Sequence, residues 1–136
     1  MKRILLTLCV LFLAYDSASS EGRIPAVPLG HDFVLKVGQA AGVEGTAFII
    51  TFVEVLEDSR CAVDVTCVWA GNAKVELQVR QAGGESTTVV LNTELEPKAA
   101  MIGRYELRLI ALAPAPRVDV PISKSDYAVT LHVSKT

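Results

Sequence analysis

The chain has 136 residues and a formal net charge of −2 at pH 7, from 13 lysines and arginines and 15 aspartates and glutamates. This mildly acidic balance gives no basic footprint, so we expect neither nucleic acid nor anionic lipid as a partner. The sequence also lacks a glycine-rich phosphate loop and a set of zinc ligands, so we expect no cofactor and no metal.

Residues 1–20 are typical of a secretory signal peptide. Lys2 and Arg3 give a positive start, and the apolar run 4–14 is about half the roughly 20 residues that a membrane-spanning helix needs. Ser20 and the small residue two positions before it fit the preference of a signal peptidase if cleavage follows Ser20. We therefore expect an exported protein, periplasmic or secreted, with no membrane span in its mature chain; an uncleaved membrane anchor is the alternative.

Residues 21–32 contain two prolines and are expected to form a flexible N-terminal arm. A single β domain is expected over 33–136, because short runs with alternating apolar residues recur between turn residues. The expected strands lie at 33–37, 46–57, 74–80, 87–91, 105–109 and 127–133. Gly83 and Gly84 join the third run to the fourth as a β-hairpin.

The run at 46–57 is apolar on both faces, with Phe48, Ile50, Phe52 and Leu56 on one side, which indicates a central strand. About seven short strands with little helical periodicity favour an antiparallel β-sandwich of the immunoglobulin-like type. A small β-barrel is the alternative. One helical turn could form at residues 96–102.

Removal of the signal peptide leaves two cysteines, Cys61 and Cys67, and in an oxidising compartment such a close pair is expected to form a disulfide. A redox pair is the alternative, but redox pairs usually have two intervening residues and precede a helix, whereas strand-like residues follow here. The ring is short, so chain entropy gives it only roughly 2 kcal/mol of stabilisation. Its expected role is to fix the shape of one loop.

The segment 57–73 carries the most specific pattern in the chain. It resembles a family of small uncharacterised exported bacterial β-domain proteins whose hallmark is Asp-Ser-Arg-Cys, a short loop and Cys-x-Trp-Ala-Gly. Ala62 stands where those relatives commonly have a proline after the first cysteine. The resemblance implies a secreted or periplasmic β domain, and it implies no activity.

The candidate binding loop consists of Asp58, Arg60, Trp69 and Asn72. If Cys67 begins a strand, Trp69 shares its face and covers the disulfide. A simpler interpretation of the charges is that Arg60 pairs with a neighbouring carboxylate while Asp58 caps a turn. Gly71 is expected to permit a bend before the next strand.

No catalytic set is present in the sequence, and we expect that the protein is not an enzyme. His31 and His132 lie at opposite ends of the mature chain, and the spacing of Glu57, Asp58 and Asp64 does not match a calcium loop. We expect a non-catalytic exported interaction module with an unknown ligand, whose partner is an envelope or extracellular protein. The alternatives are a protease-inhibitor-like domain and a structural accessory protein of the cell envelope.

Overall fold

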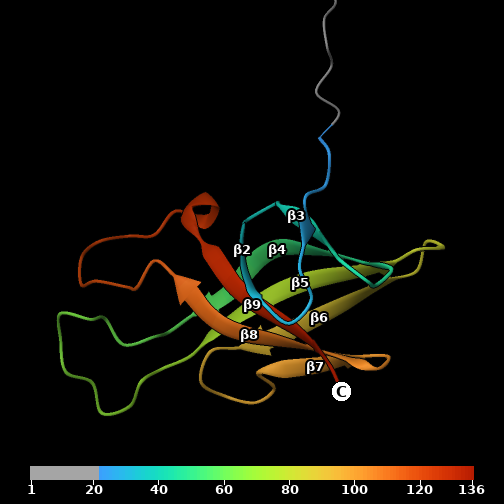
Figure 1. Ribbon diagram of the computed structural model, residues 1–136. Helices are drawn as coiled ribbons and strands as arrows, with labels where there is room; N and C mark the ends of the chain where they lie inside the picture. The colour runs from blue at the N-terminus through green and yellow to red at the C-terminus, as the bar shows by residue number, and fades with distance from the viewer. Residues whose placement is uncertain (1–21) are drawn as a thin grey trace, which may run out of the picture.

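The computed structural model describes residues 22–136, and the signal peptide expected over residues 1–20 lies outside this range. The described chain forms nine strands and one 3-10 helix, arranged in two sheets (Figure 1). The elements are β1 (Ala26–Val27), β2 (Asp32–Lys36), β3 (Ala40–Val43), β4 (Phe48–Asp58), β5 (Ala73–Gln81), β6 (Ser86–Asn92), β7 (Ala99–Ile102), β8 (Tyr105–Ala113), η1 (Lys124–Asp126) and β9 (Ala128–Lys135). Within the described range, no helix is long and apolar enough to span a membrane.

One sheet has five strands in the order β1-β3-β4-β5-β6, and the other has four in the order β2-β9-β8-β7. Neighbouring strands are antiparallel, except that β1 and β3 are parallel. The expected all-β fold is confirmed. The small barrel, considered as the alternative, is wrong, because both sheets of the described chain end in unpaired edge strands.

The core lies between the two sheets and is formed by alternate residues of the strands. Val75 and Leu77 of β5 are fully buried, as are Val129 and Leu131 of β9 in the opposite sheet, and all four belong to one core cluster. Burial of aliphatic side chains of this size stabilises a fold by roughly 1.5–3 kcal/mol each. This shared core holds the two layers together.

The prediction that residues 46–57 form a central strand is confirmed, since β4 lies between β3 and β5. The predicted faces hold only for its first half, where Ile50 and Phe52 are buried. Register shifts follow Phe52 and Val55, so Val55 packs against the core while Leu56 points outward and is 47% exposed. An extra residue in one strand changes which side chains face the core. The register shifts therefore change the side to which the last residues of β4, up to Asp58, point.

Three of the strands were not expected from the sequence. β1 lies within the segment 21–32 that was expected to be an arm, and it pairs with β3, itself a short strand of small residues. The helical turn expected at residues 96–102 is wrong, because Ala99–Ile102 pairs with β8 as β7. Alanine-rich sequence favours helix locally, and here the pairing with β8 overrides that preference.

Candidate functional site

Two long loops lie side by side at one end of the sheets, at the left of Figure 1. The disulfide loop, residues 59–72, joins β4 to β5, and the β8–β9 loop comprises residues 114–127. The two loops are joined directly, because the Val63 N–H donates a hydrogen bond to the Pro116 carbonyl at 2.9 Å. We call these two loops together the two-loop tip.

The expected disulfide between Cys61 and Cys67 is confirmed, with Cα atoms 5.9 Å apart. It closes the outer part of the disulfide loop. Nearer the sheet, the Cys61 N–H donates to the Ala70 carbonyl at 2.8 Å. The two ends of the loop are thus paired by backbone hydrogen bonds that do not need the disulfide.

Arg60 and Asp58 form a two-pronged ion pair at the start of this loop. Arg60 Nε and Nη2 donate to the two carboxylate oxygens of Asp58 at 2.8 and 2.7 Å, and the Arg60 backbone N–H donates to Oδ1 at 3.3 Å. Both side chains are only 12% exposed. The expectation that Arg60 pairs with a neighbouring carboxylate and that Asp58 caps a turn is confirmed. Such bidentate, charge-assisted pairs fix orientation as well as adding stability.

The remaining donors of Arg60 connect the two sheets. Arg60 Nη1 donates to the Leu112 carbonyl at 2.7 Å, and Nη2 also donates to the Pro114 carbonyl at 2.9 Å. Leu112 belongs to β8 of the four-stranded sheet, whereas Asp58 ends β4 of the five-stranded sheet. Arg60 therefore ties both loops to both layers of the fold.

Tyr127, just before β9, completes this cluster by donating its hydroxyl hydrogen bond to Asp58 Oδ2 at 2.9 Å. Burial opposes ionisation of Asp58, but the hydrogen bonds from Arg60 and Tyr127 outweigh it and hold the pKa of the carboxyl below 3.8. Burial and the hydrogen bond to Asp58 raise the pKa of Tyr127 to about 12. Neither group changes charge near neutral pH, so the cluster is suited to holding structure rather than to acid–base catalysis.

Gly71 allows the disulfide loop to return to the sheet. Its φ is +73°, and a Cβ added there would overlap the backbone carbonyl of Ser59 and lie 2.7 Å from the Arg60 Cα. The two strands of backbone approach so closely because the Ser59 N–H donates to the Asn72 carbonyl at 2.7 Å. The bend expected at Gly71 is confirmed, and glycine is required by both the φ value and the space.

Asn72 is buried, and both of its side-chain polar atoms are hydrogen-bonded within the fold. Its Nδ2 donates to Asn92 Oδ1 at 2.9 Å, and its Oδ1 accepts from the N–H groups of Glu94 and Leu95 at 3.1 and 3.2 Å. Asn72 is 4% exposed and Asn92 is 5% exposed. Asn72 thus anchors the disulfide loop to the segment that follows β6, and both of its side-chain polar atoms already have partners in the fold.

Trp69, unlike Asn72, is exposed to solvent. It is 57% exposed, so the expectation that it buries a large apolar area beside the disulfide is wrong. The physical reason is that no strand begins at Cys67; β5 starts only at Ala73, and the alternation assumed for residues 65–69 does not apply. The exposed large apolar side chains of the two-loop tip are Val63, Val65, Val68 and Trp69 of the disulfide loop and Val118 and Val120 of the β8–β9 loop.

The three carboxylates considered for calcium have separate protein partners. Glu57 pairs with Lys74 at 3.2 Å, Asp58 binds Arg60, and Asp64 accepts a hydrogen bond from the Val118 N–H at 3.0 Å. In the part of the chain that the structure describes, no group of three or more His, Cys, Asp or Glu residues is placed to hold a metal ion.

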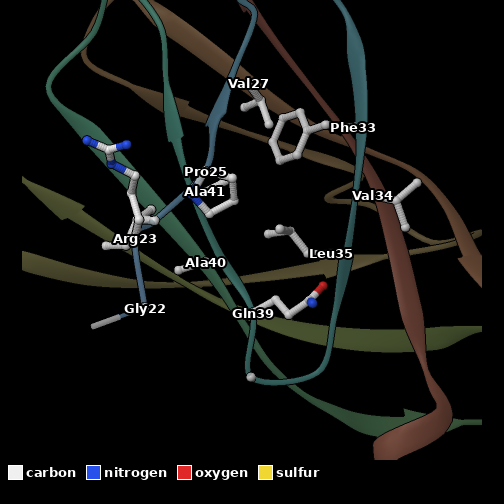
Figure 2. Close-up of a pocket in the computed structure, with 12 residues that line it drawn as sticks. Gly22, Arg23, Pro25, Val27, Phe33, Val34, Leu35, Gln39, Ala40 and Ala41 are labelled. Carbon is white, nitrogen blue, oxygen red and sulfur yellow. The ribbon is translucent and has the colours of Figure 1, made fainter. Parts of the chain in front are cut away.

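A hollow of about 550 Å³ lies elsewhere, on the side of the fold where β1 and β3 face β2 (Figure 2). The lining residues include Arg23 and three of β2: Phe33 and Leu35 point to one side of that strand and Val34 to the other. Gln39, its other long polar lining residue, already accepts the Lys36 N–H at 2.9 Å. The lining residues include no nucleophile and no acid.

Sequence reasoning missed the partners that fix the candidate site. Tyr127 lies 69 positions from Asp58 and Asn92 lies 20 from Asn72, so no local pattern signals either contact. A usable signal did exist for the exposed valines: Val63, Val65 and Val68 crowd into a loop bounded by turn-forming and charged residues. No family model, curated protein or solved structure matches the chain.

Proposed function

We propose that the protein is a non-catalytic, exported binding module that docks on a partner protein through the exposed apolar side chains of the two-loop tip. The observation that carries this proposal is the contrast between a fixed backbone and exposed side chains. Val68 is fully exposed and Trp69 is 57% exposed, yet the loop that bears them is held at both ends. Apolar side chains gain stability only when they leave water.

The fixed backbone favours binding over a purely structural role. A loop that is already ordered loses less conformational entropy when it docks, so more of the apolar contact contributes to affinity. Tryptophan is among the residues most enriched at the energetic centres of protein interfaces. In this proposal Trp69 and Val68 contact the partner, while Asp58, Arg60 and Asn72 position the loop.

The proposal includes an immunoglobulin-like arrangement of the two sheets. Sandwiches of that type carry their binding loops at one end, supplied by connections from both sheets. The convergence of the disulfide loop and the β8–β9 loop at one end supports this comparison.

The proposal also places the protein outside the cytoplasm, as the resemblance of its segment 57–73 implies, with an envelope or extracellular protein as partner. The disulfide and the apolar N-terminal run support this location, because disulfides persist in oxidising compartments. Fractionated cells treated with a thiol-reactive reagent before reduction test it. Neither Cys61 nor Cys67 is expected to be labelled, and labelling of both would contradict the assignment.

Partner capture with matched variants tests the binding surface. The variant Val68→Ser/Trp69→Ser removes the apolar contacts of the tip, and Val34→Ser removes a comparable contact on the outer side of β2, where Val34 is 61% exposed. Saturable capture is expected for the native protein and for Val34→Ser, and at least a tenfold loss, about 1.4 kcal/mol, for the tip variant. Equal capture by both variants would refute the proposal, provided that both unfold at the same urea concentration as the native protein.

A further inference from the structure

The four edge strands of the two sheets are β1, β6, β2 and β7, and an edge presents unpaired N–H and C=O groups to any other strand. Proteins usually blunt such edges by making them short or by placing proline or charge on them. β1 has two residues and lies between Pro25 and Pro28, and β7 has four residues. β2 carries Asp32 and Lys36, and its Lys36 N–H is already bonded to a side chain.

β6 has none of these protections. It runs for seven residues, Ser86–Asn92, with the sequence Ser-Thr-Thr-Val-Val-Leu-Asn, which contains neither charge nor proline. β-Branched residues dominate it, which favours an extended backbone. Of the four edges in the described chain, β6 is therefore the one best suited to accept another strand.

The hydrogen-bonding pattern shows which groups of β6 are free. The Thr93 N–H donates to the Ala73 carbonyl at the start of β5, whereas the Asn92 N–H turns the other way and donates to Pro97. Because hydrogen-bonding direction alternates along an antiparallel strand, the backbone groups of Ser86, Thr88 and Val90 also face away from β5. Asn92 is capped by the following loop, so the edge left open by residues 22–136 is Ser86–Val90.

From this geometry we infer that β6 pairs with β6 of a second copy of the chain, antiparallel and centred on Thr88. In this register Thr88 lies opposite Thr88 of the second copy, and Ser86 lies opposite Val90. The three pairs would exchange about six backbone hydrogen bonds, two from each. The two five-stranded sheets become one continuous sheet across a twofold axis.

The charges on the neighbouring strand β5 do not oppose this register. On the outer face, Glu76 of β5 lies beside Val90, and Arg80 lies beside Ser86. In the dimer, Val90 of the first copy lies opposite Ser86 of the second copy. The row of side chains through these two residues therefore begins at Glu76 of the first copy and ends at Arg80 of the second copy. No like charges face each other, and the central row contains only Gln78 and Thr88 from each copy. Glu76 of the first copy and Arg80 of the second copy lie about three strand spacings apart, about 14 Å, so they add little attraction. What favours a second copy is that neither β6 carries a charge and that the register sets Thr88 against Thr88, a cross-strand pair that can share a hydrogen bond.

The inferred dimer is weak and closed. A five-residue edge buries far less than the roughly 1,600 Å² of a standard stable interface, so dimerisation is expected only at high protein concentration. The twofold pairing consumes both β6 edges, and the two-residue β1 at the far side of each sheet gives growth no second site. The interface does not involve the two-loop tip, so it does not depend on the proposed function.

Sedimentation of the purified protein over a range of concentrations reaching about 1 mM, together with charge variants, tests the inference. Thr88→Lys and Thr88→Glu each place like charges at the twofold axis, so each alone is expected to weaken dimerisation at least tenfold. An equal mixture of the two variants is expected to restore a heterodimer. Gln78→Lys is the matched control, because its copies lie three strand spacings apart, about 14 Å, which is beyond the screening length of about 8 Å at physiological salt.

Hydrogen exchange gives a second readout that does not depend on charge. The amides of Thr88 and Val90 are expected to gain protection as protein concentration rises, while the exchange of the tip amides stays unchanged. The inference is overturned if the native protein remains a monomer, if Thr88→Lys dimerises as well as Gln78→Lys does, or if association continues beyond the dimer. Dimerisation abolished by Val68→Ser/Trp69→Ser instead would assign the contact to the tip and overturn it equally.

Discussion

Tyr127 donates a hydrogen bond to Asp58 at 2.9 Å, joining residues that are 69 positions apart in the chain: Asp58 ends β4 of the five-stranded sheet, and Tyr127 directly precedes β9 of the four-stranded sheet. Asp58 also receives two side-chain hydrogen bonds from Arg60, and Arg60 in turn donates to the Leu112 carbonyl of β8. The Asp58 carboxylate therefore lies where β4, β8, the start of β9 and both loops meet. Hydrogen bonds to residues of both sheets therefore fix the position of the two-loop tip.

Replacement of Tyr127 by phenylalanine removes this hydrogen bond and leaves the ring in place. Hydrogen bonds to charged groups contribute roughly 1.5–3 kcal/mol, so we expect the free energy of unfolding to fall by about 2 kcal/mol. Urea denaturation measures this change. Tyr105→Phe is the control, because the ring of Tyr105 packs edge-on against Phe48 at 5.4 Å and that contact needs no hydroxyl. Equal losses in the two variants would show that the Tyr127 hydroxyl has no special role.

Stability in acid is expected to depend on Asp58. Its pKa is lowered in the folded protein, so the stabilisation is complete above the pKa of about 3.9 in the unfolded chain and is lost as pH falls through the lower folded value. Asp58→Asn removes this contribution, so its free energy of unfolding should vary less steeply with pH below about 4.

Urea titrations at a series of acidic pH values measure that slope. Glu85→Gln, in the exposed turn between β5 and β6, removes one carboxylate without touching the cluster and serves as the control. Identical slopes for Asp58→Asn and the native protein would contradict the role assigned to the ion pair.

Gly71→Ala is expected to destabilise the protein more than a substitution at another glycine with positive φ. Both Gly71 and Gly38 have such φ values, +73° and +83°, which disfavour alanine by roughly 1–2 kcal/mol. Only at Gly71 does the added Cβ also overlap the Ser59 backbone, whereas at Gly38 nothing lies within 4 Å. Thermal unfolding should show a clearly larger loss for Gly71→Ala, and equal losses would mean that the close approach to Ser59 is relaxed at little cost.

The sequence predicted those parts of the fold that depend on local alternation. Alternating apolar residues predicted a strand at 74–80, and β5 forms there with Val75, Leu77 and Val79 buried. The alternation failed at Leu56, where an irregular register reverses the faces, and at Trp69, where no strand exists. In both cases the outcome depends on how the segment pairs with a neighbouring strand. The alternation of residues within one segment does not reveal that pairing.

The candidate site was predicted by position but not by role. Asp58 ends β4, and Arg60, Trp69 and Asn72 lie in the loop that follows it. The polar atoms of Asp58, Arg60 and Asn72 are nevertheless used by Tyr127, the Leu112 carbonyl and Asn92. Those partners come from other elements at long sequence distance, so only the three-dimensional structure distinguishes the residues that position the loop from the residues that it exposes.

The disulfide is expected to matter less than this cluster. Cys61→Ser/Cys67→Ser should lower the free energy of unfolding by roughly 2 kcal/mol or less, because the closed ring is short. The amide of Cys61 or its serine replacement should stay protected from hydrogen exchange through the Ala70 carbonyl, while the Val65 amide loses protection. Global unfolding of the double variant would instead make the disulfide the main stabiliser.

Trp69 is the only tryptophan of the chain, so its fluorescence reports on the two-loop tip alone. The central claim is that Trp69 is exposed in the free protein and becomes buried against a partner. Acrylamide quenching, measured on the free protein and on its complex with the partner captured through the tip, tests this most directly. We predict efficient quenching in the free protein and strong protection in the complex. A Trp69 that is already shielded in the free monomer, or that stays equally quenched in the complex, would contradict the account.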